Sequence, residues 1–187
     1  RSISGLIKKG EIVGRAYVLP NKDTIIAIGG ANVDRKFHIQ GRVQHGTSNP
    51  ASVTESVGGV ARNIAENLGR LGNQVKLLTT VGYDQDWEAI YQASKEYIEL
   101  DLVEKMNQYQ TGSYSAVLNE DGELVLAMAN MAIYDKLLPS VLKKHEAILA
   151  NSKGIIVDLN CPKETVEYLQ ALAYRRTIPF AIIPVSS

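Results

Sequence analysis

The chain has 187 residues, with 20 Lys and Arg against 20 Asp and Glu, and 45% of its residues are hydrophobic. This composition is typical of an ordinary globular protein and excludes collagen, coiled coils and disordered tails. The zero net charge argues against a surface built entirely for nucleic acid or anionic lipid.

The chain has a single cysteine, Cys161, which cannot form an internal disulfide. Secreted domains usually pair their thiols, so we expect a cytoplasmic protein. The apolar runs at residues 75–81 and 180–185 are far shorter than the roughly 20 residues that a membrane-spanning helix needs. The sequence therefore predicts no membrane partner.

The first twenty residues are predicted to hold the last turns of a helix, closed by Gly10, and then a small hairpin. Residues 20–23 are predicted to be a linker. The sequence starts at Arg1 without a Met and stops at Ser187, directly after an apolar run. We therefore expect it to be a portion of a longer protein.

From residue 24 onward, predicted strands and helices alternate. The strands are short apolar runs, and the helices carry apolar residues at a 3.6-residue spacing. Strands are predicted at residues 24–28, 75–81, 154–157 and 180–184, and helices at 61–71, from about 86, at 139–151 and from 162. Such repeats indicate an α/β fold, with a mostly parallel sheet covered by helices on both faces.

The middle of the chain departs from this alternation. Residues 111–118 have the two-residue alternation of a strand, and Asn119-Glu120-Asp121-Gly122, a sequence typical of a turn, joins them to residues 123–128. We predict a β-hairpin there, which projects from the parallel sheet.

The loop that follows the first predicted strand carries Asn32 and Asp34. Ligands of open α/β sheets bind beyond the carboxyl ends of the strands. A carboxylate at this place can accept hydrogen bonds from two neighbouring hydroxyls, the arrangement that a sugar diol offers. The alternative is an Asx turn that only stabilises its own loop.

A second loop, Gly58-Gly59, stands immediately ahead of the predicted helix at 61–71. Two glycines let the backbone approach a ligand, and the helix N-terminus offers amides to hydroxyl or phosphate oxygens. The loop lacks the Gly-Lys-Ser/Thr ending of a P-loop and the dinucleotide fingerprint. A plain strand-to-helix turn is the alternative interpretation.

Together these segments resemble a known family. The run from Gly58 to Ala65, followed by Gly72 and Gly82, is similar to the first signature of the ribokinase-like (PfkB) carbohydrate kinases, and residues 29–34 resemble that family's sugar loop. The resemblance covers residues 24–187. It implies a three-layer ribokinase-like α/β fold with a mostly parallel sheet and a small β-lid, incomplete at the C-terminus.

Within the family, the chain looks most like the pseudouridine kinases. Arg62 beside Asn63 carries this likeness, together with residues 47–50, 111–114 and 184–186. The resemblance implies phosphorylation of a sugar or nucleoside hydroxyl by ATP, with Mg²⁺ as the metal.

The resemblance also implies a set of site residues. Residues 35–57 and 111–128 would form the lid, in which Thr111 and Ser113 could touch the substrate. The residues expected to bind the sugar or nucleoside are Asn32, Asp34, Gly58, Gly59, Asn63 and Asn160.

Three positions depart from the family pattern. Asn130 and Ile183 stand where an Asp is expected, and Trp87 stands where a Gly is usual. An Ile in place of an Asp removes an acceptor and a charge, so we expect an altered nucleotide side of the site.

The family's catalytic Gly-Ala-Gly-Asp motif is absent from the 187 residues. Its Asp would serve as the base, and its glycine amides would stabilise the transferring phosphoryl group. We therefore predict that this chain alone is inactive. The other candidates receive structural roles: His38 and His45 on a solvated lid, Asp84 as a helix cap, His145 on a helix surface and Cys161 as a filler.

Residues 1–20 resemble a different module, the end of the third helix and the wing of a winged helix-turn-helix, which would make DNA a partner. A stray hairpin packed on the sheet is the alternative. The rival function is a sugar- or nucleoside-sensing transcriptional regulator with a non-catalytic kinase-like domain. A third possibility is a homodimer formed through the β-lid.

Overall fold

The computed structural model describes residues 23–185. The expected helix end, hairpin and wing at residues 1–20 lie outside the described residues, and so do residues 186 and 187.

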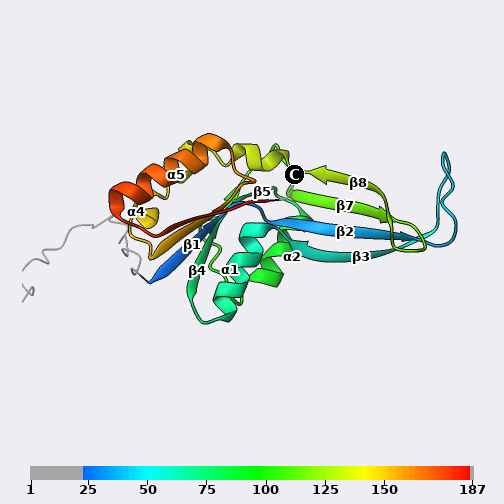
Figure 1. Ribbon diagram of the computed structural model, residues 1–187, viewed down its shortest axis with the longest axis horizontal. Helices are drawn as coiled ribbons and strands as arrows, with labels where there is room; N and C mark the ends of the chain where they lie inside the picture. The colour runs from blue at the N-terminus through cyan, green and yellow to red at the C-terminus, as the bar shows by residue number, and fades with distance from the viewer. Residues whose placement is uncertain (1–22, 186–187) are drawn as a thin grey trace, which may run out of the picture.

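A parallel sheet forms the centre of the molecule (Figure 1). Its strands are β1 (Thr24–Ile28), β4 (Gln74–Leu78), β9 (Gly154–Asp158) and β10 (Phe180–Ile183), in the order β10-β9-β1-β4. Every neighbouring pair is parallel. These strands are apolar because helices cover both faces of the sheet.

Helices cover the sheet as two layers. The helices α1 (Val60–Arg70) and α2 (Gln85–Ser94) lie on one face, and α3 (Pro139–Lys143), α4 (Glu146–Leu149) and α5 (Lys163–Arg176) lie on the other (Figure 1). Alternate strand residues supply the two cores: Ile26 and Ile28 pack toward α5, whereas Ala27 packs toward α1. The predicted three-layer α/β fold with a mostly parallel sheet is confirmed.

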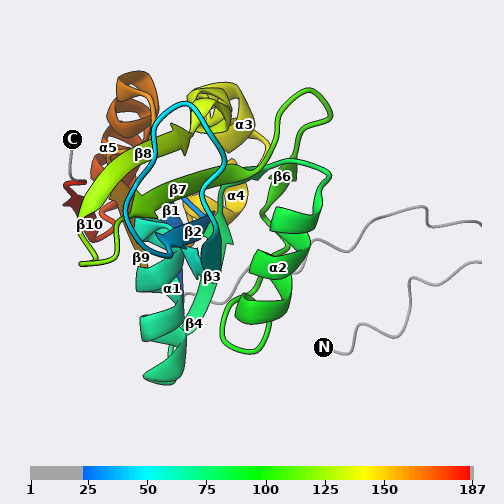
Figure 2. The same cartoon turned by 90° about the vertical axis from the view of Figure 1, so that its right-hand side faces the viewer.

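A second four-stranded sheet projects from one end of this body, and Figure 2 looks along it. We call it the lid sheet. Its strands are β2 (Asn32–Ile39), β3 (Ala51–Gly58), β7 (Gly112–Leu118) and β8 (Leu124–Asn130), in the order β3-β2-β7-β8. The predicted hairpin at 111–128 is its antiparallel β7–β8 pair, whereas β2 and β7 run parallel.

Two short strands and one short helix complete the connections. The strands β5 (Thr80–Val81) and β6 (Glu104–Lys105) pair with each other, and η1 (Ala132–Lys136) is a 3₁₀ turn after β8. The predicted strand at 75–81 is therefore divided at Thr79, because residues 80–81 leave the central sheet to pair with β6.

The predicted helix at 139–151 is also divided, into α3 and α4. Between them, the amides of Lys144 and His145 donate to carbonyls three residues back, the hydrogen bond of a tighter 3₁₀ turn. The side chains of both residues contact Glu104 on β6, at 2.7 Å and 2.9 Å. His145 was predicted to lie on the surface, but its side chain is only 16% exposed because of this contact.

Candidate functional site

The predicted sugar-binding loop lies where the central sheet meets the lid sheet. Gly29, Gly30 and Ala31 link the end of β1 to Asn32, the first residue of β2. Asn32 and Asp34 share one face of β2, because successive strand residues alternate between faces. The amide Nδ2 of Asn32 donates to Asp34 Oδ1 at 2.6 Å.

Asp34 is half-buried against Gly58. A Cβ atom on Gly58 would overlap Asp34 Oδ2 and would lie 3.3 Å from Asn32 Nδ2, so only glycine leaves room for the carboxylate. Burial raises the pKa of Asp34, and the hydrogen bond from Asn32 and the charge of Lys36 offset part of that rise.

Gly59 is the residue before α1, and its backbone requires glycine. Its φ of 100° is in the region that other residues rarely adopt, and a Cβ atom there would overlap the carbonyl of Gly30. Asn63 follows in the first turn of α1: its amide donates to Gly59 O at 2.8 Å, and its side-chain oxygen accepts from Arg62 at 3.1 Å.

Arg62 is 5% exposed and fixes α1 against α2. Its guanidinium donates to Ser94 Oγ at 3.0 Å and forms an ion pair with Glu66 at 2.5 Å. The buried face of this helix therefore differs from the purely apolar face predicted for residues 61–71. Arg62 is buried, whereas Leu71, predicted to face inward, is 78% exposed because it follows the end of α1.

Asn160 reaches the same loop from the end of β9. Its Nδ2 lies 3.0 Å from the position that a Cβ atom on Gly30 would take. The structure therefore brings Asn32, Asp34, Gly58, Gly59 and Asn160 together around Gly30, although they come from three separate segments of the chain.

Sequence reasoning missed two residues that hold this loop. Asp158 is fully buried, and its carboxylate accepts backbone hydrogen bonds from Gly30, Ala61 and Asn160. The hydroxyl of Tyr134, on η1, donates to Ala31 O at 2.7 Å and accepts from Ala31 N at 3.1 Å. Burial raises the pKa of Tyr134, so it remains protonated. The polar residue at the end of an apolar strand was the available signal for Asp158.

Thr111 does not lie at this site. Its hydroxyl donates to Asp84 Oδ1 at 2.7 Å and accepts from the Gly82 amide at 2.9 Å, so its hydrogen-bonding groups are occupied. Asp84 also accepts from Trp87 N at 2.9 Å, and it is the predicted cap of α2.

Ser113 lies on the opposite face of the lid sheet from Asp34. In the register of β2 and β7, Ser113 pairs with Val33 and Tyr114 pairs with Asp34. Ser113 lines a hollow of about 350 Å³ with Arg35 and Asp84 instead. Tyr114, a residue the sequence did not single out, is therefore the β7 residue that pairs with Asp34 and shares its face.

An ion pair fastens the lid sheet to the body. Arg35 on β2 contacts both carboxylate oxygens of Asp86 on α2 and donates to Glu55 on β3 at 2.9 Å. Bidentate contacts of this kind fix orientation as well as distance. The angle between lid sheet and body is thus held on the face opposite Asp34.

The other residues considered from the sequence lie away from the loop at Gly30 or pack in the core. Cys161 is buried in the core beside α5, as predicted for a filler, and burial raises its thiol pKa. His38 is half-buried on β2, and His45 is exposed in the loop between β2 and β3. Trp87, which stands where the family usually has Gly, is buried on α2.

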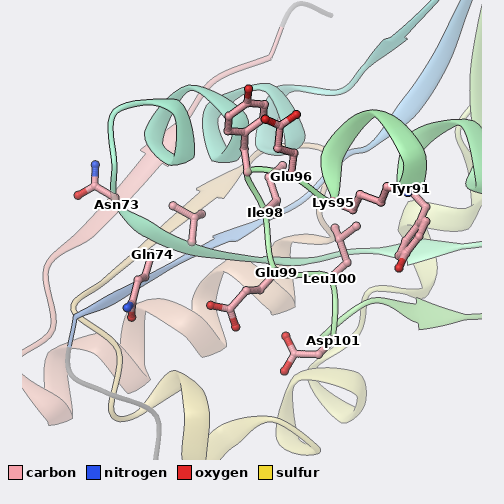
Figure 3. Close-up of a pocket in the computed structure, with 11 residues that line it drawn as sticks. Asn73, Gln74, Tyr91, Lys95, Glu96, Ile98, Glu99, Leu100 and Asp101 are labelled. Atoms are coloured by element: carbon pink, nitrogen blue, oxygen red, sulfur yellow. The ribbon is translucent and has the colours of Figure 1, made fainter.

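A hollow of about 630 Å³ lies at the other end of the sheet. Figure 3 shows its lining, in which Lys95, Glu96, Glu99 and Asp101 surround the start of β4. Since β1 and β4 are parallel, this is the amino end of the strands, opposite the loop at Gly30. It is therefore separate from the candidate site.

Mg²⁺ is usually held by one or two carboxylates together with waters and substrate phosphates. Among residues 23–185, no three or more His, Cys, Asp or Glu side chains are gathered to hold a metal ion. In the same range, none of the helices has the length and apolar character to span a membrane.

Known proteins share both the sequence and the fold. A pseudouridine kinase of Escherichia coli is 30% identical over 167 residues, which are 89% of this chain and 53% of that protein. The structure of a carbohydrate kinase from Agrobacterium tumefaciens is 33% identical, with a TM-score of 0.78 over 88% of this chain and 54% of that one.

A more distant neighbour is the ribokinase of Arabidopsis thaliana, complexed with ribose and ATP. It is 19% identical, with a TM-score of 0.78, and the match covers 86% of this chain and 53% of that one. The predicted ribokinase-like fold is confirmed by these likenesses. The chain spans about half the length of the curated relatives it matches.

The sequence model of the pfkB family carbohydrate kinases matches residues 22–185. This match covers all of the described residues and includes every segment around Gly30, so the chain belongs to the pfkB family of carbohydrate kinases.

Proposed function

We propose that this chain forms the substrate-binding part of a kinase that transfers a phosphoryl group from ATP to a hydroxyl of a ribosyl compound such as pseudouridine. The observation that carries the proposal is the half-buried carboxylate of Asp34, oriented by Asn32 and seated against Gly58. The likeness to the E. coli pseudouridine kinase supports this substrate class.

The site offers acceptors and donors for a sugar diol. The Asp34 carboxylate accepts from two adjacent hydroxyls, while Asn32, which donates to Asp34, retains its carbonyl oxygen for the ligand. The Gly59 amide, Asn63 and Asn160 supply further hydrogen bonds from the opposite side. Because the carboxylate is partly desolvated before the ligand arrives, its hydrogen bonds to hydroxyls are strong ones.

The chemistry of transfer is proposed to need residues outside these 187. Phosphoryl transfer depends on in-line positioning, a base for the hydroxyl and neutralisation of the γ-phosphate charge. Asp34 binds hydroxyls in this proposal and does not serve as the base. ATP use is supported by the ATP in the ribokinase structure of the same fold. No step is assigned to Mg²⁺, because residues 23–185 hold no cluster of three or more His, Cys, Asp or Glu side chains that could bind a metal by itself.

A transcriptional regulator is the second candidate. It is supported by the departures at Asn130 and Ile183, which place an amide and an alkyl group where the resemblance implies carboxylates. In that case the ligand would bind through the same Asp34 site, and residues 1–20 would belong to the DNA-binding module.

We also propose a homodimer formed through the lid sheet. Val53, Phe37, Val117 and Leu126 lie in one row across its four strands, on the face opposite Asp34. Val53 is 52% exposed and Leu126 is 53% exposed. Exposed apolar rows of this kind mark interaction surfaces, and a second copy presents the same row.

The test uses the protein encoded by the complete gene. Calorimetry with pseudouridine, ribose and inosine should show binding of at least one of them, and a coupled assay with ATP should show its phosphorylation. Binding without phosphorylation, together with DNA binding that the same ligand changes, would support the regulator. Absence of binding to any ribosyl compound would refute both.

A further inference from the structure

The carboxylate of Asp158 lies at the end of β9 and joins three segments of the site. Its Oδ2 accepts from Gly30 N at 2.9 Å and from Ala61 N at 2.8 Å, and its Oδ1 accepts from Asn160 N at 2.9 Å. Asp158 is 0% exposed. None of the ion pairs within residues 23–185 involves it, so in that range its charge is balanced by amides.

The helix α1 lacks a cap of its own. Its N-cap residue is Gly59, which has no side chain, and its first turn carries no acidic residue. The first amides of a helix have no partner within the helix and carry partial positive charge. Asp158 satisfies one of them from 97 positions further along the chain. The carboxylate therefore caps α1 and anchors the Gly30 loop with the same oxygen atom.

The two glycines after β1 make room for this arrangement. A Cβ atom on Gly29 would overlap the Asp158 carboxylate, and one on Gly30 would lie 3.0 Å from Asn160 Nδ2. The diglycine thus admits two side chains from the end of β9. The contacts of Asp158 therefore set how far apart three segments lie: residues 32–34, the start of α1 and Asn160.

We propose that Asp158 is a positioning residue for substrate binding. It acts through the backbone of Gly30, Ala61 and Asn160, holding the side chains that contact the ribosyl group at their mutual distances. This inference rests on the proposed function. It predicts that a change at Asp158 weakens binding of the ribosyl compound and leaves the affinity for ATP unchanged.

The experiment uses Asp158→Asn in the complete protein. The amide side chain keeps the volume, and its oxygen can still accept from Gly30 and Ala61, but its NH₂ group then faces the Asn160 amide. We expect the Kd for pseudouridine to rise about tenfold or more, with the Kd for ATP unchanged. Asp158→Ser, which keeps one acceptor, is the reserve variant in case Asp158→Asn does not fold.

The matched control is Thr165→Val on α5. Thr165 is also 0% exposed, and its hydroxyl donates to the carbonyl of Leu137, so the change removes a buried hydrogen bond without altering a residue proposed to contact the ligand. This variant should lower the melting temperature and leave the Kd for pseudouridine unchanged. Equal losses of affinity in both variants would show that general destabilisation is the cause, and unchanged affinity in Asp158→Asn would overturn the proposal.

A double-mutant cycle that combines Asp158→Asn with Asn160→Ala tests whether Asp158 acts through Asn160. If Asp158 acts partly through Asn160, the double variant loses less affinity than the product of the two single losses, because contacting residues are not additive. Fully multiplicative losses would contradict action through Asn160.

Hydrogen exchange separates this inference from the proposed function. In the free protein, Asp158→Asn should speed exchange in residues 29–34, 59–63 and 159–162 relative to Thr165→Val, with β4 unchanged in both. If the wild-type protein binds no ribosyl compound, the proposed function is wrong. Hydrogen exchange then tests by itself whether Asp158 holds the three segments in place. Unchanged exchange in those three segments would overturn it.

Discussion

The Oδ2 atom of Asp34 occupies the space that a Cβ atom on Gly58 would take. The two residues come from neighbouring antiparallel strands, since Asn32 pairs with Gly58 and Asp34 with Ser56. The carboxylate therefore reaches across β3 only because residue 58 has no side chain.

The first prediction concerns Gly58→Ala. The backbone of Gly58 does not have a positive φ, so its conformation is one that alanine can adopt, and alanine removes some freedom from the unfolded chain. The added methyl group displaces Asp34, so we expect a loss of at least about tenfold in affinity for the ribosyl compound, or about 1.4 kcal/mol. Calorimetry measures it. Gly154→Ala is the control, because its Cβ atom would meet its nearest neighbour at 3.6 Å, an ordinary contact.

The second prediction concerns Asp34→Ala, which should cost about 2 to 4 kcal/mol of binding because the hydroxyls of the ligand lose a charged acceptor. An affinity equal to that of the wild-type protein would remove Asp34 from the site.

The isosteric change Asp34→Asn tests the same carboxylate by its pH dependence. Its pKa is raised in the folded state, so ionised Asp34 opposes folding. The stability it contributes is complete below the unfolded value of 3.8 and is lost as the pH rises through the folded value. At neutral pH the Asn variant should therefore melt no lower than the wild-type protein. A clearly lower melting temperature of Asp34→Asn would contradict the conclusion that ionised Asp34 opposes folding.

The third prediction concerns Asp84→Asn. Although burial acts in the opposite direction, hydrogen bonds from Thr111 and Trp87 hold the pKa of Asp84 below its usual value. Its stabilisation is therefore present above 3.8 and is lost as the pH falls through the lower folded value. Asn can still cap α2, but its NH₂ group would face the Thr111 amide that now donates to Asp84 Oδ2, so we expect the variant to lose about 1 kcal/mol at neutral pH. Chemical denaturation at pH 7 and pH 3 should show the difference shrinking at the lower pH. A larger difference in unfolding free energy at pH 3 than at pH 7 would contradict a stabilising role for ionised Asp84.

The fourth prediction concerns the 187-residue chain by itself. Because it contains no Gly-Ala-Gly-Asp segment, it should transfer no phosphoryl group from ATP to pseudouridine, ribose or fructose 6-phosphate. Transfer of labelled phosphate is the measurement. Turnover that disappears in Asp34→Ala would place the base within these residues.

The fifth prediction concerns the apolar row on the lid sheet. Leu126→Asp should convert a dimer into monomers, because a charge on the edge strand β8 would be buried within the apolar interface. Light scattering after size exclusion gives the mass. The control is Leu71→Asp, since Leu71 is 78% exposed at the C-terminal end of α1 and is not part of the lid sheet. A monomeric wild-type protein, or equal effects of both changes, would exclude the row as the interface.

The sequence by itself determined the layers of the fold and pointed to the candidate site. Apolar runs such as Thr24–Ile28, separated by helices with one apolar face, have few ways to bury their surface other than a helix-covered parallel sheet. The polar loop after β1 was then predicted to be the site, because strand ends are where such sheets bind ligands. The cap at Asp84 followed from local rules in the same way.

Only the tertiary structure decided which polar residues meet. The contact of Asp158 with Ala61 joins positions 97 apart, and no local propensity encodes it. Strand register, which depends on pairing between distant segments, placed Tyr114 rather than Ser113 beside Asp34. A shift of one residue moves a side chain to the other face of a sheet. Local spacing predicted where most strands and helices lie, whereas pairing with distant segments divided the strand at 75–81 and set the face that each lid residue presents.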